Sequence, residues 1–355
     1  ACRRNMDALL RRPGPLSAYR SNSSWPVGPV AGSWAWRFER DAEKLLNVRH
    51  VVACANGTLA LIVALRALDL PPGEVITSSF TFSATSAAIR FAGHEPVFAD
   101  VEPRTFCLDP EGVAKVVGPQ TRALLPVDLF GARADYGKLR AFGLPIVEDA
   151  CQAVGTGMGC HGDIAAVSFN GTKNIPAGEA GAVLTDRRDL AERVRRFASH
   201  GENWSHPEVG LNARLNEPTA LLAWHGLKEL RKRNATRRRL ARVLVGELCG
   251  HAKIRTLPHL VGPPLYVFPL VLAEGVDRAR FADNLKRLGV EVGKGYLTPI
   301  LTDYPAFSSC RRTEMPVAMD LSNRSLVLFS QVRPPATTRD MKWLAGAIRT
   351  SLDSA

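Results

Sequence analysis

The chain has 355 residues, of which 46% are hydrophobic and 23% are charged, as in an average folded globular protein. Its length is enough for one large domain and a smaller one, because single hydrophobic cores stop growing at roughly 250–300 residues. The apolar stretches fall short of the ~20 residues that a membrane-spanning helix needs, which argues against a membrane protein. The N-terminal residues lack the order of a secretory signal, so we expect a cytoplasmic protein.

The formal net charge is +12, and such an excess of cations fits an anionic partner such as a nucleotide, a phosphorylated metabolite or a nucleic acid. Much of the excess lies at 231–233 and 237–239, within one predicted helix. We interpret these arginine clusters as a solvated helix face rather than a nucleic-acid-binding stripe. The seven cysteines are scattered without a CxxC pair, which predicts reduced thiols and no metal site.

From about residue 49 to residue 186, short β-branched apolar runs alternate with helical patterns. This alternation predicts an α/β domain with a mostly parallel sheet covered by helices. We expect seven strands, at 51–54, 75–78, 96–101, 123–129, 146–148, 165–169 and 181–184. Helices are expected between them, for example at 58–68 and 85–92.

The rest of the chain predicts a different organisation. Residues 216–249 read as one long helix or a broken pair of helices. Beyond them, we expect strands at 266–272 and 325–329 and helices at 277–288 and 338–352. These elements predict a smaller α+β unit, and we divide the chain into a large domain, 1–240, and a small C-terminal domain, 241–355.

The first chemically informative segment is Ala-Cys-Ala-Asn-Gly-Thr-Leu-Ala-Leu at 53–61, where an apolar strand runs through a short turn into a helix. This arrangement aims backbone N–H groups and the helix dipole at one point, which suits a phosphate. Gly57 allows a close approach of the backbone, and Thr58 adds a hydroxyl donor. Alternatively, Thr58 is simply the N-cap of the helix.

The second segment is Ile-Val-Glu-Asp-Ala-Cys-Gln at 146–152, a buried strand that ends in acidic residues. Open α/β sheets bind ligands at the carboxyl edge, where this strand ends. A carboxylate at Asp149 can pair with a protonated pyridine nitrogen and keep the ring electron-withdrawing. A turn aspartate that caps the next helix is the alternative.

The third segment is Val-Ser-Phe-Asn-Gly-Thr-Lys-Asn at 167–174, in which a strand leads through Ser168 and a small-residue turn to Lys173. Lysine is the residue that forms Schiff bases, because desolvation and nearby cations leave its amine free to attack. A solvated loop lysine is the plainer interpretation of this segment taken alone.

Together these segments resemble the DegT/DnrJ-type sugar aminotransferases, a family of fold-type I enzymes that use pyridoxal phosphate (PLP). The resemblance covers roughly residues 30–235. It rests on Asn-Gly-Thr at 56–58, Thr-Phe-Ser-Ala-Thr at 81–85, Val-Glu-Asp-Ala-Cys-Gln-Ala at 147–153, Ser-Phe-Asn-Gly-Thr-Lys at 168–173, Gly-Glu-Ala-Gly at 178–181 and Gly-Leu-Asn-Ala-Arg at 210–214. It implies a large domain with a mostly parallel seven-stranded sheet and a smaller C-terminal α+β domain.

The resemblance also implies roles for individual residues. Lys173 is expected to form the Schiff base with PLP, and Asp149 to bind the pyridine nitrogen. The remaining contacts are expected from Gln152 to the ring hydroxyl, from Phe82 to the ring face, from Gly57, Thr58 and Ser168 to the phosphate, and from Asn212 of the neighbouring subunit to the phosphate. A homodimer with shared active sites follows from the last of these contacts.

Some positions depart from the family pattern. Ala180 replaces a glycine, Ala213 replaces an aromatic residue, and the segment at 152–163 looks shorter than usual. The usual His-Tyr-x-Pro appears only as Gly-Tyr-Leu-Thr-Pro at 295–299. Substrate recognition is therefore the least transferable property.

The activity implied is a ping-pong transamination in amino sugar biosynthesis. The amino group would pass from an amino acid, glutamate or glutamine, to a keto sugar, most readily a nucleotide-linked one, with Lys173 moving the proton. A cyclitol or another biosynthetic ketone is the alternative acceptor. A regulatory or nucleic-acid-binding protein that uses the arginine clusters is the alternative from another class.

The resemblance also places three further residues near the site, either as substrate contacts or as structural residues: His200, Glu179 and Tyr296.

Overall fold

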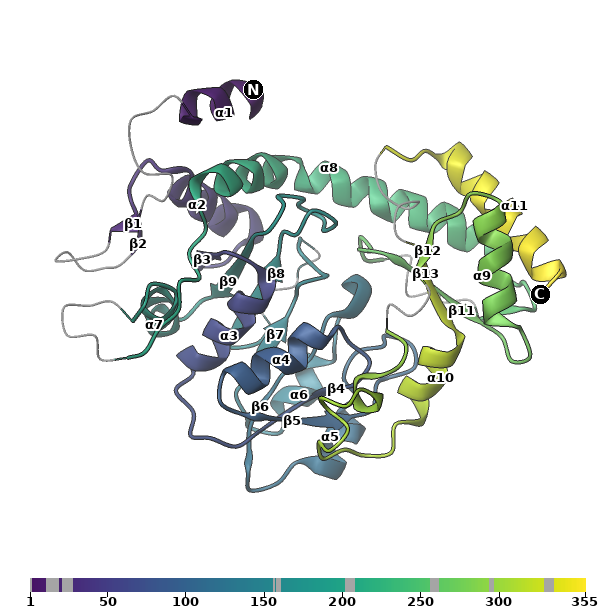
Figure 1. Ribbon diagram of the computed structural model, residues 1–355, viewed down its shortest axis with the longest axis horizontal. Coiled ribbons are helices and arrows are strands. Elements are labelled where there is room, and N and C mark those ends of the chain that lie inside the picture. The colour runs from purple at the N-terminus through teal and green to yellow at the C-terminus, as the bar shows by residue number, and fades with distance from the viewer. Residues whose placement is uncertain are drawn as a thin grey trace.

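The structure, a computed structural model, describes residues 2–10, 19–20, 28–155, 157, 161–201, 208–255, 262–293, 297–328 and 335–355. These residues form a large α/β body and a smaller C-terminal part, bridged by one long helix (Figure 1). Within these ranges no helix is both long enough and apolar enough to cross a membrane.

The large body is built on two sets of hydrogen-bonded strands. The first set has the order β3 (His50–Cys54), β9 (Gly181–Thr185), β8 (Ile164–Ser168) and β7 (Val147–Asp149). The second set has the order β6 (Thr121–Leu124), β4 (Glu74–Ser78) and β5 (Glu95–Ala99). Parallel bridges from Leu124 to Ile146 and from Val127 to Asp149 join the two sets. Of these strands β9 alone runs against its neighbours, which confirms the expected mostly parallel sheet.

Helices cover both faces of this sheet, and the side chains of each strand alternate between the two faces. Val52 and Cys54 of β3 pack in one core with the helices α3 (Gly57–Ala67), α4 (Ser83–Phe91) and α7 (Arg188–Ala198). Val51 and Ala53 point to the other face, which is covered by α2 (Trp34–Leu46) and α8 (Glu217–Leu248). Further along that face lie α5 (Pro110–Val116) and α6 (Tyr136–Arg140).

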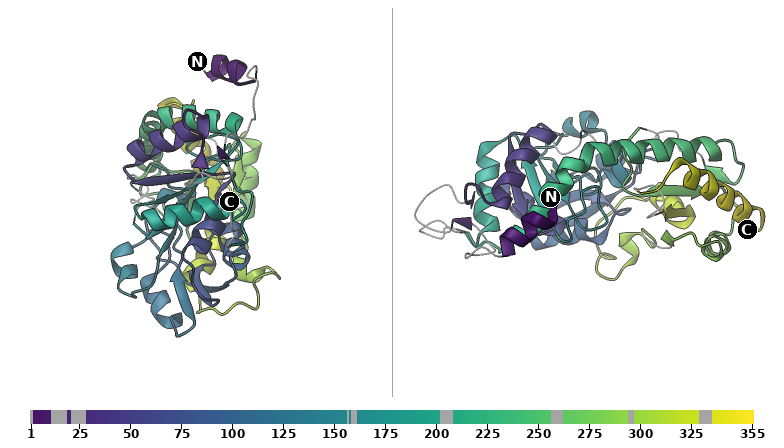
Figure 2. Two further views of the ribbon diagram at one scale, coloured as in Figure 1. Left: turned by 90° about the vertical axis from the view of Figure 1, so that its left-hand side faces the viewer. Right: turned by 90° about the horizontal axis from the view of Figure 1, so that it is seen from above.

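The expected element at 216–249 is the single helix α8, not a broken pair. It extends from α2 to the C-terminal helix α11 (Thr338–Asp353), and Figure 2 shows it in green along the length of the molecule. The boundary that we placed at residue 240 falls within this helix, and the division into domains stays a prediction. At the other end of the chain, α1 (Cys2–Leu10) contacts α8 through Asn5 and His225.

The C-terminal part contains an antiparallel sheet in the order β10 (Ile254–Arg255), β11 (Phe268–Leu272), β13 (Ser325–Leu328) and β12 (Val292–Gly293). It is accompanied by α9 (Arg278–Arg287), α10 (Pro316–Arg324) and α11, which agrees with the predicted α+β unit. Phe329, the last residue of a predicted strand, lies outside the described residues. The remaining short elements are β1 (Tyr19–Arg20), β2 (Gly28–Pro29) and the 3-10 helices η1 (Leu129–Gly131) and η3 (Leu301–Asp303).

Candidate active site

The carboxyl ends of β3, β7 and β8 meet at one edge of the large sheet. Gly57, the first residue of α3, lies against the end of β8: a Cβ atom built on Gly57 would be 2.8 Å from Ser168 Cβ and 3.0 Å from Cys151 Sγ. Both distances are shorter than the ~3.5–4.0 Å of an ordinary carbon contact, so only glycine fits without movement. The structure thus brings the predicted residues Gly57 and Ser168 together.

The N-terminus of α3 points at this contact. Asn56 is the N-cap of the helix, since its Oδ1 accepts a hydrogen bond of 2.9 Å from the Leu59 amide. The alternative interpretation of Thr58 as the N-cap is therefore wrong. Thr58 is the second helical residue, and the amides of Gly57 and Thr58 precede the first intrahelical hydrogen bond, which the Ala60 amide donates. Amides in that position, together with the helix dipole, suit a phosphate.

Asp149 is a buried carboxylate at the end of β7, with 4% of its surface exposed. Its Oδ2 accepts a hydrogen bond of 2.8 Å from the Thr85 hydroxyl, and its Oδ1 accepts one of 3.2 Å from the Cys151 amide. Thr85 is a residue that the sequence reasoning quoted within the motif at 81–85 but gave no role. These two hydrogen bonds fix the orientation of the carboxylate.

Cys151 lies between the carboxylate and the helix terminus. Burial raises the pKa of the Cys151 thiol well above its usual range, and the Asp149 carboxylate raises it further, while Lys173 opposes both effects. The thiol is therefore protonated and neutral at ordinary pH. Lys173 follows Ser168 through a short turn in which the Asn170 amide donates a hydrogen bond of 3.3 Å to Ser168 Oγ, so the lysine lies at the same edge of the sheet.

Lys173 is held by an ordered turn. Its amide donates a hydrogen bond of 2.8 Å to the Asn170 carbonyl, and the Thr172 amide and hydroxyl donate to Asn170 Oδ1 at 3.1 and 3.0 Å. The next residue, Asn174, is buried and donates to the Pro264 carbonyl at 3.1 Å. Lys173 is half-buried, and its Nζ lies 3.9 Å from the ring centroid of Tyr266. The interpretation of Lys173 as a solvated loop lysine is wrong.

Two other predicted cofactor residues lie nearby. Gln152 is buried, and its Oε1 accepts a hydrogen bond of 2.9 Å from the Phe130 amide. Phe130 has a left-handed backbone with φ of 58°, an uncommon conformation for a residue other than glycine. Because Oε1 is held, the Nε2 donor is the atom of Gln152 that would reach a ring hydroxyl. Phe82 precedes α4, and 54% of its surface is exposed.

Asn212 is exposed and pairs through its backbone with Ser199 of the same chain. Its predicted contact requires a neighbouring subunit.

Of the three residues placed here by resemblance, Glu179 accepts a hydrogen bond from Asn170 and so belongs to the lysine turn. His200 Nε2 lies 3.2 Å from Arg214 Nη2, and Tyr296 lies outside the described residues.

The arginine clusters of α8 divide into two kinds of residue. Arg231 and Lys232 are exposed, as a solvated face requires. Arg237 is only 4% exposed, and its Nη1 donates hydrogen bonds of 2.9 Å to the carbonyls of both Leu265 and Tyr266. The interpretation of both clusters as a solvated face is therefore wrong at Arg237, which instead holds the segment that contacts Lys173.

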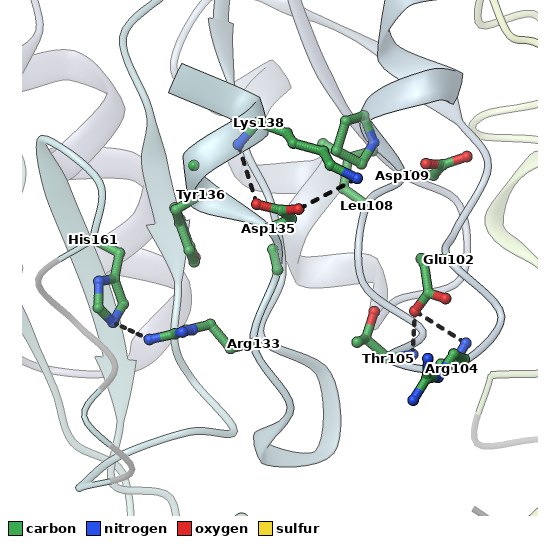
Figure 3. Close-up of a pocket in the computed structure, with 13 residues that line it drawn as sticks. Glu102, Arg104, Thr105, Leu108, Asp109, Arg133, Asp135, Tyr136, Lys138 and His161 are labelled. Carbon is green, nitrogen blue, oxygen red and sulfur yellow. Dashed lines mark hydrogen bonds and ion pairs between the residues drawn. The ribbon is translucent and has the colours of Figure 1, made fainter. Parts of the chain in front are cut away.

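A hollow of about 580 Å³ opens between the loop before α5 and the helix α6 (Figure 3). Inside it Lys138 pairs with Asp135, and Arg133 points toward His161. Its lining includes Tyr136 but none of the predicted cofactor-binding residues. It is thus separate from the sheet edge described above.

Behind this hollow lies a buried pair of carboxyl groups. Asp128 accepts hydrogen bonds from the Ala134 amide at 3.1 Å and the Tyr136 hydroxyl at 3.2 Å, and its carboxyl group also contacts that of Glu148. Burial raises the pKa of Asp128 well above its usual range, and the neighbouring Glu148 adds to this effect. Glu148 also accepts a hydrogen bond of 2.9 Å from the His161 amide. The pair supports the loops behind Asp149.

The described residues contain no group of three or more His, Cys, Asp or Glu side chains placed to hold a metal ion. A mostly parallel α/β sheet with a helix N-terminus, a buried carboxylate and a half-buried lysine at its carboxyl edge defines a fold-type I transferase. The model of the DegT/DnrJ/EryC1/StrS aminotransferase family matches residues 26–348, and the chain belongs to this family. The protein is accordingly an aminotransferase.

Individual relatives extend over most of the chain. It is 33% identical over 338 residues to the UDP-N-acetyl-3-dehydro-alpha-D-glucosamine 3-aminotransferase of Acidithiobacillus ferrooxidans, covering 91% of this chain and 90% of the relative. It is 31% identical to the L-glutamine:2-deoxy-scyllo-inosose aminotransferase of Streptomyces lividus, covering 87% and 84%. The crystal structure of NtdA from Bacillus subtilis with bound cofactor PMP matches with a TM-score of 0.82 and 26% identity, covering 99% and 82%.

Proposed function

We propose that this aminotransferase binds PLP at the carboxyl edge of the large sheet and transfers an amino group from glutamate or glutamine to a nucleotide-linked keto sugar. The observation that carries the proposal is the convergence of Gly57, Ser168 and Asp149 with the half-buried Lys173. The PMP bound to the Bacillus subtilis structure supports the choice of cofactor.

The residues present fit this cofactor. A Cβ atom on Gly57 would fill the space against Ser168. Because glycine has none, its backbone carries no side chain where a phosphate would meet the first amides of α3. The Ser168 and Thr58 hydroxyls would add donors to the phosphate. The Asp149 carboxylate, already oriented by Thr85, would hold the pyridine nitrogen. When bound, PLP supplies an electron sink for the carbon whose bond to hydrogen is broken.

The reaction assigns a task to each of these residues. Lys173 would hold the cofactor through Nζ, and its amine would be free for proton transfer once an amino acid takes its place. Its free amine would move the proton between the substrate carbon and C4′ of the cofactor, because it is the base that the turn at 170–173 holds beside the reacting atoms. Asp149 would maintain the positive charge of the ring nitrogen. Gln152 would donate from Nε2 to the ring hydroxyl, and Phe82 would cover the ring face.

Two observations favour a nucleotide-linked keto sugar as acceptor. The net charge of +12 favours an anionic substrate, and a diphosphate supplies that charge. The Acidithiobacillus ferrooxidans relative is named for a UDP-linked sugar. A cyclitol ketone is the second candidate, because the Streptomyces lividus relative is named for 2-deoxy-scyllo-inosose and for L-glutamine as donor.

We also propose a homodimer in which Asn212 of one subunit reaches the phosphate held by the other. Support comes from its position: Asn212 is exposed, and the next residue, Ala213, accepts a hydrogen bond of 2.7 Å from the Ala55 amide at the end of β3. Asn212 is thus held rigidly at the surface beside the strand that leads into the phosphate site. The cytoplasmic location stays a prediction.

The first experiment adds PLP to the wild-type protein and to Lys173→Ala and records absorption spectra. We expect a Schiff-base band that borohydride traps at Lys173 in the wild type and that glutamate or glutamine abolishes. Keto sugars with and without a nucleotide, and a cyclitol ketone, are then tested for restoring the band. The absence of any PLP band in the wild type would reject the cofactor assignment, and salt-dependent nucleic-acid binding would then have to be tested.

A further inference from the structure

Tyr266 lies against the amine of Lys173, although it belongs to a segment almost one hundred residues later in the chain. Its ring centroid is 3.9 Å from Lys173 Nζ, and only 6% of its surface is exposed. Its hydroxyl lies 3.0 Å from Thr172 Oγ1, next to Lys173 in the same turn. The side chain therefore contacts both the amine and the turn that carries it.

The direction of the hydrogen bond between Tyr266 and Thr172 follows from the neighbouring contacts. Asn170 donates from its Nδ2 to Glu179, so its Oδ1 is the acceptor for Thr172. A threonine hydroxyl has one hydrogen, and that of Thr172 goes to Asn170. The hydroxyl of Tyr266 must then be the donor to Thr172, which fixes the rotation of the phenol about its C–O bond.

The backbone of Tyr266 is anchored at both ends. Its amide donates to the Phe130 carbonyl at 3.2 Å, and its carbonyl accepts from the buried Arg237. Two residues earlier, the Pro264 carbonyl accepts from Asn174, the residue that follows Lys173. The ring and the lysine are thus attached to one hydrogen-bonded unit, and neither can move without disturbing the other.

We propose that Tyr266 is a positioning residue of the proposed aminotransferase reaction: once Lys173 is free of the cofactor and has taken the proton, the ring of Tyr266 holds its ammonium group beside the reacting atoms. This inference rests on the proposed function. A ring face attracts a cation that lies within ~6 Å, and it cannot accept the proton as a carboxylate would. The flexible lysine therefore stays within reach of the carbon that it must protonate. Arg237 is a positioning residue for this ring.

The contact itself is tested on the full-length protein without cofactor. Its lysines are reductively methylated with ¹³C-labelled formaldehyde, and Lys173→Arg identifies the signal of Lys173. Methyl groups above a ring face are shifted upfield, so we expect the Lys173 signal to be shifted in the wild type and in Tyr266→Phe, and unshifted in Tyr266→Leu. An unshifted Lys173 signal in the wild type would overturn the inference, whatever the enzyme's activity.

The role is tested by single-turnover reaction of the PLP-loaded protein with glutamate. We expect Tyr266→Leu to lower the rate constant about tenfold without changing the glutamate concentration at half-saturation, and Tyr266→Phe to lose less than about threefold. Tyr304→Leu, at an exposed tyrosine outside the site, is the matched control. If Tyr266→Leu reacted as fast as Tyr266→Phe, the inference would fail while the proposed function stood.

A second substitution covers the case in which Tyr266→Leu does not fold. Pentafluorophenylalanine at position 266 keeps the shape of the ring but withdraws electrons from its face, so attraction of the ammonium group is lost. We expect its rate to fall about tenfold below that of Tyr266→Phe, and equal rates would overturn the inference. If instead the wild type formed no PLP band, the proposed function would fail, and the upfield shift would still report whether the contact exists.

Discussion

Replacing Gly57 by alanine tests the phosphate cradle directly. The added Cβ would meet Ser168 Cβ at 2.8 Å, Cys151 Sγ at 3.0 Å and Ser168 Oγ at 3.3 Å. Ordinary contacts begin near ~3.5 Å, so the first turn of α3 must move away from β8 by about 0.5–1 Å. Overpacking of this kind costs ~1–3 kcal/mol, whereas alanine in a helix is favoured over glycine by at most ~1 kcal/mol.

The expected net result is a free energy of unfolding lower by about 0–2 kcal/mol. The effect on PLP should be larger, because the amides of Gly57 and Thr58 move with the helix. Hydrogen bonds to a charged group contribute ~1.5–3 kcal/mol each, so losing the alignment of one weakens PLP binding about 10- to 100-fold. Urea denaturation of the cofactor-free protein and an absorbance titration with PLP measure the two quantities.

Gly246 in α8 is the matched control. It is an exposed helical glycine, and a Cβ built on it has no atom within 4 Å. Gly246→Ala should therefore raise the free energy of unfolding by ~0.5–1 kcal/mol and leave PLP affinity unchanged. If Gly57→Ala bound PLP as tightly as the wild type while Gly246→Ala behaved as expected, the placement of the phosphate against Gly57 would be refuted.

Three further substitutions probe the groups around this cradle. Thr85→Val leaves one oxygen of Asp149 without its 2.8 Å hydrogen bond, so PLP titration should show binding weaker by ~1–3 kcal/mol, with Thr85→Ser close to the wild type. Burial raises the pKa of Asp128 in the folded state, so the folded protein keeps a proton that the unfolded chain has already released. The stability that comes from this bound proton is lost as the pH rises through the folded pKa. Asp128→Asn should thus become more stable relative to the wild type between about pH 5 and 8 in urea titrations, and the opposite trend would contradict the assignment. Arg237→Met should lower the thermal unfolding temperature and the rate of PLP capture, whereas Arg231→Met, on the exposed face of the same helix, should change neither.

The positions of the strands in the large sheet could be predicted from the sequence because each strand is short, apolar and buried on both faces. The strand expected at 123–129 ends earlier, at Leu124, although Val127 still bridges to Asp149. Pro126 interrupts the ladder because it has no N–H donor. The 3-10 turn that follows is held by Gln152, whose side chain accepts from Phe130. No local pattern reveals a hydrogen bond that reaches across the sheet in this way.

The candidate site was predictable where its residues belong to contiguous motifs, as Asp149 and Lys173 do. Tyr266 and Arg237 were missed because their roles depend on how distant segments pack. A signal for Arg237 did exist in the helical spacing: Leu230, Asn234 and Arg237 follow one another at intervals of four and three, and all are buried. Polar residues in the buried stripe of an amphipathic helix indicate partners inside the protein rather than solvent.

The role of the buried Arg237 follows from the two backbone carbonyls to which it donates hydrogen bonds. Removing a guanidinium from water costs several kcal/mol, which the hydrogen bonds of Arg237 to two carbonyls offset, and an apolar residue at this position would leave both carbonyls without that donor. Arg237 orients the backbone of this segment: its Nη1 donates to the consecutive carbonyls of Leu265 and Tyr266 and so fixes the ring that faces Lys173. Asn234, one turn earlier, accepts from Asn174 beside that lysine. The long helix therefore orients both partners of the contact, and the geometry of the amine depends on α8 as much as on the sheet that carries it.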